Sequence, residues 1–137
     1  DVNLKENNFF ISANFLLHEN PLNNSLGIIK NYLKDRRSKQ PTGFPSCGSV
    51  FKNPDNAHAA NLIDSLGLKG YKIGGAYISE KHANFIISDN GTKSSDIESL
   101  IIFIQKKVYE KKKIFLETEV KFIGNKLWIE ITEKFWF

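Results

Sequence analysis

Apolar residues in three stretches recur at the three- and four-residue spacing of an amphipathic helix. The first stretch follows Pro21 and ends in the basic run 34–39, and the second is stopped by Gly67. The third begins at Ser95, where Glu98 three residues later could complete a capping box. The sequence therefore predicts three helices. Their apolar positions are Leu22, Leu26, Ile29 and Leu33; Ala59, Leu62, Ile63 and Leu66; and Ile97, Leu100, Ile101, Ile104 and Val108.

Four other stretches have the pattern of β-strands. Residues 9–17 and 114–123 alternate between two faces, and 9–17 has one face that we expect to be buried on entering the domain. Residues 83–88 are a short apolar run followed by the turn signal 89–91. Residues 127–131 can form a last strand.

Between these elements, 40–56 contains three prolines and two glycines, which disfavour helices and central strands. We expect it to be a long ordered or functional loop. Further glycines around Tyr71 indicate tight turns. Because helices and strands do not alternate regularly, we predict an α+β fold, a single domain with a mixed sheet packed against about three helices.

Composition narrows the function classes. The formal charge of +4 is a mild excess, and no signature of a nucleic-acid-binding domain is present, so a nucleic-acid binder is a weak alternative. One cysteine, Cys47, excludes an internal disulfide. No apolar run has the length of a membrane helix and no export signal precedes the first strand. We expect a cytoplasmic protein, and the start at Asp1 leads us to expect a chain cut from a longer one.

Candidate chemistry begins in the proline-rich loop. There a hydroxyl, Ser49, follows a glycine and precedes Lys52 and Asn53. A restrained loop of this kind can present hydrogen-bond donors to an anion. The alternative is a surface turn in which Ser49 caps the backbone.

A second candidate site lies in the strand pattern 114–123. Glu119 and Lys121 are two residues apart, so on a strand their side chains lie on one side, about 7 Å apart. They can converge on one ligand, although Glu117 shares that face. The alternative is a solvated strand face carrying a weak ion pair.

Basic residues and one histidine complete the candidates. Arg36, Arg37 and Lys39 precede the Ser49 loop and suit phosphate binding, or they form a solvated helix end. His82 precedes the buried strand 83–88, where it could contact a ligand or satisfy a structural hydrogen bond. The histidines have no partners at metal-ligand spacing, so we predict no metal site.

Four segments of the chain resemble the UDP-N-acetylenolpyruvoylglucosamine reductase family, also called UDP-N-acetylmuramate dehydrogenases. The first reads Pro-Ser-Cys-Gly-Ser-Val-Phe-Lys-Asn-Pro and the last Leu-Glu-Thr-Glu-Val-Lys-Phe-Ile-Gly. They occur in the family's order and with similar spacing, from about Phe9 to Gly124. The four matching segments are 45–54, 59–70, 73–76 with 79–85, and 116–124.

The resemblance implies a substrate-binding part of a flavoenzyme of peptidoglycan precursor synthesis. Complete members use NADPH to reduce FAD, which passes hydride to the enolpyruvyl group of UDP-GlcNAc-enolpyruvate and yields UDP-N-acetylmuramate. The region that binds FAD in the family is missing from this chain. The resemblance further implies a cytoplasmic monomer when full length, with no nucleic-acid or membrane partner. It divides the chain into 1–20, the end of a middle, flavin-contacting domain; 21–124, the C-terminal substrate-binding domain; and 125–137, an extra strand or tail.

The resemblance also implies roles for individual residues. Ser49 matches the family's proton donor, and Glu119 matches the glutamate that polarises the developing enolate. Lys121 stands where many members have arginine, so it keeps the charge but loses the bidentate fork. The implied substrate-binding residues are Asn53, Lys52, Arg37, Lys39, His82 and Lys121. A non-catalytic module that binds UDP-sugars remains the alternative function.

Overall fold

The computed structural model describes residues 11–18 and 24–124. Contacts divide the chain into two compact units, Asp1–Leu33 and Lys34–Phe137, with the boundary inside helix α1 (Ser25–Lys39). Several predictions fall outside the described residues. They are the start of the first strand at Phe9 and Phe10, the helix position Leu22, and the tail 125–137 with its expected strand.

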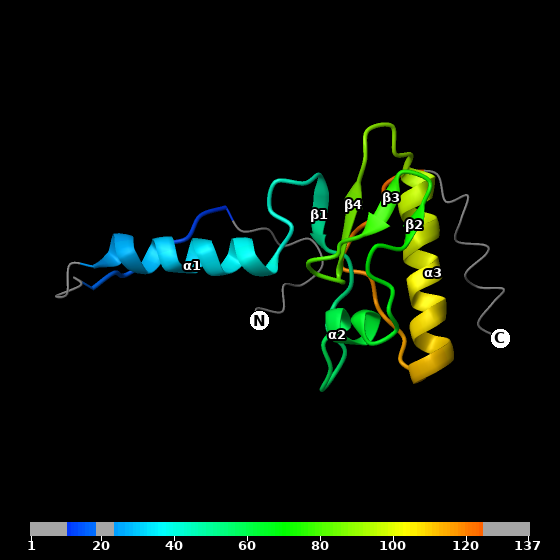
Figure 1. The fold of residues 1–137 in the computed structure, drawn as a ribbon. Coiled ribbons are helices and arrows are strands. Elements are labelled where there is room, and N and C mark those ends of the chain that lie inside the picture. The colour runs from blue at the N-terminus through cyan, green and yellow to red at the C-terminus, as the bar shows by residue number, and fades with distance from the viewer. Residues whose placement is uncertain (1–10, 19–23, 125–137) are drawn as a thin grey trace. The chain divides into compact units, whose positions relative to one another are not determined.

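The second unit contains a four-stranded sheet in the order β1-β4-β3-β2 (Figure 1). Its strands are β1 (Ser46–Ser49), β2 (Lys72–Ile73), β3 (Ala76–Ile78) and β4 (Phe85–Ser88). The α+β class is confirmed, but every strand pair of this sheet is antiparallel, so the expected mixed sheet is wrong. Only short turns join β2, β3 and β4, whereas a parallel pair needs a crossover of a dozen or more residues.

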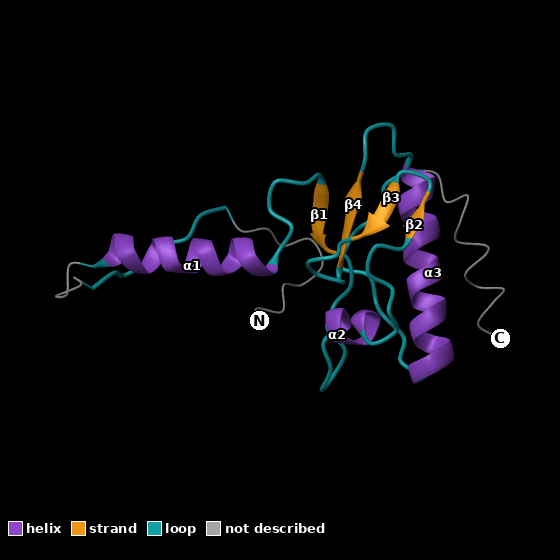
Figure 2. Ribbon diagram, viewed as in Figure 1, coloured by secondary structure: helices purple, strands orange, loops and turns teal. Residues whose placement is uncertain are grey.

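Two helices accompany this sheet (Figure 2). Helix α3 (Ser94–Lys112) contacts β2, β3 and the short helix α2 (Ala59–Asp64). Both helices match the apolar spacing of the sequence. Their buried positions include Ala59 and Ile63 of α2 and Leu100, Ile101, Ile104 and Val108 of α3.

The start of α3 differs from the expected capping box of Ser95 and Glu98. The helix begins at Ser94 with Lys93 as its N-cap, two residues before Ser95, and the carboxylate of Asp96 accepts hydrogen bonds from Lys93 N (3.1 Å) and Gly75 N (3.2 Å). Asp96 therefore ties the first turn of α3 to the turn between β2 and β3. Local spacing could not reveal this choice, because one of the two donors lies 21 residues away.

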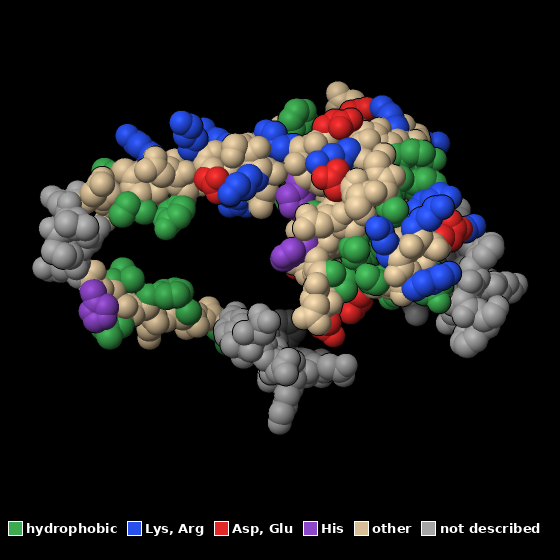
Figure 3. Space-filling view, turned by 60° about the horizontal axis from the view of Figure 1, so that its bottom comes forward, with side chains coloured by type: hydrophobic (Ala, Val, Ile, Leu, Met, Phe, Trp, Pro, Cys, Tyr) green, Lys and Arg blue, Asp and Glu red, His purple; other side chains and the backbone are tan. Residues whose placement is uncertain are grey.

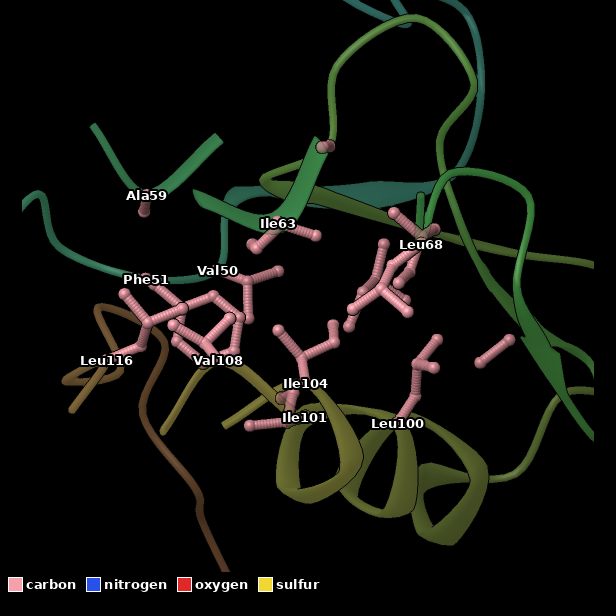
Figure 4. Packing of buried hydrophobic residues seen from close by; sticks show 14 residues of the cluster. Val50, Phe51, Ala59, Ile63, Leu68, Leu100, Ile101, Ile104, Val108 and Leu116 are labelled. Carbon is pink, nitrogen blue, oxygen red and sulfur yellow. The ribbon is translucent and has the colours of Figure 1, made fainter. Parts of the chain in front are cut away.

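The core lies between α3, α2 and the segment that follows β1 (Figure 4). Val50 and Phe51 are fully buried there beside Ile63, Ile104 and Leu116. The expectation of a long loop over 40–56 is therefore partly wrong, because this stretch supplies β1 and two core side chains. Its prolines and glycines surround these residues without preventing their burial.

The two alternating segments do not form ladders. Residues 11–17 have no regular secondary structure and their large apolar side chains are exposed, so the strand with a buried face is wrong for them. Residues 114–123 form a single antiparallel bridge, between Phe51 and Thr118. Alternation shows which face of a strand could be buried, but it does not supply a partner strand.

Helix α1 shows the same limit of the pattern. Its apolar positions Leu26, Ile29 and Leu33 are all exposed, and none of its residues is buried. Hydrophobic side chains are visible along one side of this helix and Lys and Arg side chains along the other (Figure 3). The predicted helix and its basic end are confirmed. Its apolar stripe is exposed.

Candidate functional site

A bulge in β1 positions Ser49. Ser46 pairs with Ile87 and Ser49 with Phe85, so β1 has one more residue than β4 between these pairs. Gly48, inside the bulge, has φ of +80°, a conformation that glycine adopts without strain. Bulges bend a strand and change the direction of a side chain. Ser49 directly follows the bulge, at the end of β1.

The backbone next to Ser49 brings in the second candidate. Val50 O accepts a hydrogen bond from Glu119 N at 2.8 Å, and Lys52 N donates to Glu117 O at 2.9 Å. These bonds flank the bridge between Phe51 and Thr118. Although the predicted strand 114–123 does not form a ladder, its central residues are fixed beside the end of β1.

Ser49 and Glu119 line the same open concavity, with a volume of about 260 Å³. Among the described residues, Cys47 and Val120 also line it. No hydrogen bond among residues 11–18 and 24–124 involves the Ser49 hydroxyl, so it is available to a ligand. A hydroxyl beside a carboxyl group in an open concavity can deliver a proton and polarise an oxygen of the same ligand.

Asn84, which sequence reasoning missed, holds the backbone between these two residues. Its side chain accepts from Phe51 N (3.0 Å) and donates to Phe51 O (2.8 Å), and its own carbonyl accepts from Val50 N (2.9 Å). The side chain is 4% exposed. A signal was present: an asparagine inside the apolar run 83–88 must find hydrogen-bond partners when it is buried.

The other predicted substrate-binding residues do not line the concavity. Lys52 forms an ion pair with Glu117, and both side chains are exposed. Asn53 accepts a hydrogen bond from Ala59 N at 3.0 Å, so its side-chain oxygen holds the start of α2. One face of each side chain is thus occupied by a structural contact.

The basic end of α1 is also occupied in part. Lys39 pairs with Asp35 at 2.8 Å, and Lys81 Nζ donates to the carbonyl of Arg37 at 3.0 Å. Lys121 is exposed. The structure therefore brings Ser49 and Glu119 together but leaves Arg37, Lys39 and Lys121 outside the lining of the concavity.

His82 has the structural hydrogen bond that we considered as its alternative role. Its Nδ1 accepts from Asn84 N at 3.3 Å, and its ring packs edge-on against Phe85 at 4.8 Å. Burial lowers the pKa of His82 below its usual 6.5, and a nearby positive charge, Lys69, acts in the same direction. The imidazole is therefore neutral at neutral pH, which suits an acceptor nitrogen.

Two further properties concern the part of the chain that the structure describes. Within residues 11–18 and 24–124, no three His, Cys, Asp or Glu side chains cluster in a way that could hold a metal ion. No helix within these ranges has the length and apolarity needed to cross a membrane.

Comparison with known proteins gives consistent results. The model of the UDP-N-acetylenolpyruvoylglucosamine reductase C-terminal domain matches residues 40–123. A protein named UDP-N-acetylenolpyruvoylglucosamine reductase from Caldicellulosiruptor bescii is 57% identical over 69% of this chain and 30% of its own length. One of the same name from Prochlorococcus marinus subsp. pastoris is 48% identical over 88% of this chain and 41% of its own.

A solved structure supports the match. The crystal structure of UDP-N-acetylenolpyruvylglucosamine reductase from Thermus caldophilus aligns with 76% of this chain and 36% of its own, at a TM-score of 0.61 and 34% identity. The chain thus spans less than half the length of these relatives. The matched region includes both Ser49 and Glu119. The chain belongs to the UDP-N-acetylenolpyruvoylglucosamine reductase family.

Proposed function

We propose that this chain is the substrate-binding part of an enzyme that reduces UDP-GlcNAc-enolpyruvate to UDP-N-acetylmuramate for peptidoglycan synthesis. The observation that carries the proposal is the shared concavity of Ser49 and Glu119 in a chain of this family. The reaction adds hydride to one vinyl carbon and a proton to its neighbour. An acid and a group that stabilises negative charge must therefore lie beside the same part of the substrate.

Ser49 is the proposed proton donor. Its hydroxyl has no hydrogen-bond partner among the described residues, and the bulge at Gly48 places it in the concavity. The Ser49 Oγ–H bond breaks as the carbon that has become negatively charged takes the proton. A serine hydroxyl is a weak acid, so the transient alkoxide needs stabilisation by nearby positive charge or donors.

Glu119 is the proposed polarising group. Its carboxyl group lines the concavity together with Ser49, where it would polarise the enolate that develops on the substrate. The backbone bond from Glu119 N to Val50 O joins Glu119 to the residue that follows Ser49. The two residues can therefore act on neighbouring atoms of one ligand.

The described residues fit the substrate side of flavin chemistry. A hydroxyl and a carboxyl group in an open concavity suit a proton transfer that accompanies hydride addition. Bound FAD, reduced by NADPH, would supply the hydride. We place FAD binding in the part of the protein that this chain does not cover, because the relatives are more than twice as long.

We propose that the concavity accepts only part of the substrate. Its volume of about 260 Å³ is below the roughly 300–1,000 Å³ of pockets that enclose drug-sized ligands. We propose that it accepts the enolpyruvyl end and that the nucleotide extends outside it. Residues 21–124 would form the substrate-binding domain. The residues proposed to meet the remainder of the substrate are Arg37, Lys39, Lys52, Asn53, His82 and Lys121.

The test measures NADPH oxidation driven by UDP-GlcNAc-enolpyruvate in the complete native protein. We expect Ser49→Ala and Glu119→Gln each to lower kcat by about 100-fold or more, which corresponds to roughly 3 kcal/mol of barrier, with a smaller change in KM. Glu98→Gln, which removes a charge on α3 outside the concavity, is the matched control. Wild-type turnover with unchanged Ser49→Ala activity would reject the role of Ser49.

A non-catalytic module that binds UDP-sugars remains the second candidate. The open concavity of about 260 Å³ is compatible with binding alone. Calorimetric binding of UDP-GlcNAc by a native protein that has no flavin and no turnover would favour this candidate. For the reductase we further propose a cytoplasmic monomer without nucleic-acid partners, which light scattering and fractionation of cells can check.

A further inference from the structure

The backbone of Val50 and Phe51 directly follows Ser49 and is hydrogen-bonded to Glu119. One buried side-chain amide, that of Asn84, holds one edge of this segment. Asn84 accepts from Phe51 N at 3.0 Å and donates to Phe51 O at 2.8 Å, so it pairs with both polar groups of that residue. On the other edge of the same segment, Val50 O accepts a hydrogen bond from Glu119 N. Asn84 and Glu119 therefore bond to opposite edges of the segment Val50–Phe51.

The side chain of Asn84 is suited to hold a fixed position. It is 4% exposed, and its backbone N–H donates to His82 Nδ1 while its carbonyl accepts from Val50 N. Burial excludes water that could replace a lost bond, so removal of either side-chain bond leaves an unpaired polar group. Asn84 is not among the residues that line the concavity, and its side-chain hydrogen bonds are to the backbone.

We propose that Asn84 is a positioning residue that sets the distance between Ser49 and Glu119, an inference that rests on the proposed function. Ser49 immediately precedes Val50, and Glu119 is bonded to Val50 O. A shift of Phe51 therefore changes the placement of both reactive groups. Misplacement of reacting groups by about 1 Å can lower a rate by roughly 100-fold.

The discriminating variant is Asn84→Asp. Above the pKa of the introduced carboxyl group, the variant retains an acceptor for Phe51 N but has no donor for Phe51 O. Burial raises that pKa, and the protonated group has the shape and the donor of the original amide. Its effect should therefore be reversed by acid, whereas the effect of Asn84→Ala should not.

Other titratable groups lie close to this position. His82 contacts Asn84 directly, and Lys52 and Glu117 flank Phe51 from the two bonded segments. Asn84→Ala retains all three. Any pH dependence that arises from them will appear in that variant and in the wild type as well, and the ratio of variant to wild-type rate removes it.

In the complete native protein, we expect Asn84→Asp to lower kcat about 10- to 100-fold near about pH 8, with KM changed less than about 3-fold. Between about pH 8 and about pH 5.5 its kcat relative to wild type should recover at least about 5-fold. The relative kcat of Asn84→Ala should stay constant. Amide hydrogen exchange should show lost protection of the Phe51 N–H in Asn84→Ala, which has no acceptor for it, and retained protection in Asn84→Asp.

Asp96→Ala is the matched structural control, because it also removes two hydrogen bonds between a side chain and the backbone and Asp96 does not line the concavity. It should lower the unfolding temperature without lowering kcat. A relative kcat of Asn84→Asp that does not change with pH, or equal loss of kcat in Asp96→Ala, overturns the inference. Absence of turnover in the wild type would instead reject the proposed function, and the exchange measurement would still test the hold on Phe51.

Discussion

The same apolar pattern has opposite outcomes in the two units of this chain. In the second unit, the stripe of α3 is buried against α2, the sheet and the segment after β1, and Leu100 is 0% exposed. In the first unit, Leu26 occupies an equivalent place in the stripe of α1 and is 74% exposed. The periodicity of a helix therefore identifies the side that can be buried, while burial depends on a partner surface.

The contrast is relevant to function because the described residues that line the candidate site, Cys47, Ser49, Glu119 and Val120, belong to the unit with a core. Ser49 and Glu119 flank Val50 and Phe51, which are buried among the core side chains. A site built on packed residues can hold two reactive groups at a fixed distance.

The largest expected change in stability comes from a substitution in the buried stripe of α3. Leu100→Ala should lower the free energy of unfolding by about 2–5 kcal/mol, because it removes buried methyl groups and leaves a cavity. Denaturant unfolding of the wild type and the variant measures this difference. A loss below about 1 kcal/mol would show that α3 is less firmly packed than its burial indicates.

Much of the second unit could be predicted because its signals are local. The stripe of α3, the strand 83–88 and the turn 89–91 depend on neighbouring residues, and each has its counterpart in the structure. The antiparallel order of the sheet and the start of α3 depend on distant contacts. For that reason the mixed sheet and the Ser95 capping box were wrong.

The candidate site was predictable only in part. The resemblance identified Ser49 and Glu119, and the structure places them in one concavity. The bulge at Gly48 and the amide of Asn84 were missed, since both act through backbone pairing between segments more than 30 residues apart. Burial of Phe51 was hidden by the prolines around it.

A smaller effect is expected where α3 meets the β2–β3 turn. Hydrogen bonds from Lys93 N and then Gly75 N lower the pKa of Asp96 below its ordinary value of 3.8. A carboxyl group with a lowered folded-state pKa stabilises the fold above its unfolded pKa, and the stabilisation is lost as pH falls through the folded-state value. Asp96→Asn should therefore be less stable than wild type at neutral pH.

Thermal unfolding across the acidic range tests this expectation. The difference between wild type and Asp96→Asn should be constant above about pH 5 and should shrink as the pH falls through 3.8 and below it. Glu98→Gln is the control for loss of a negative charge in the first turns of α3. A difference that does not vary with pH would show that the charge of Asp96 does not contribute.

The smallest effect is expected at Leu26, where the comparison can be broken directly. Leu26→Ala is the same substitution as Leu100→Ala, also within a helix, but the side chain is 74% exposed. Alanine is an equally good or better helix former, so the free energy of unfolding should change by less than about 0.5 kcal/mol. Denaturant unfolding of both variants under the same conditions gives the two values. A loss above about 1.5 kcal/mol for Leu26→Ala would mean that the stripe of α1 is covered in solution. The apolar stripes of both units would then be buried, and the units would differ only in the surface that covers each stripe.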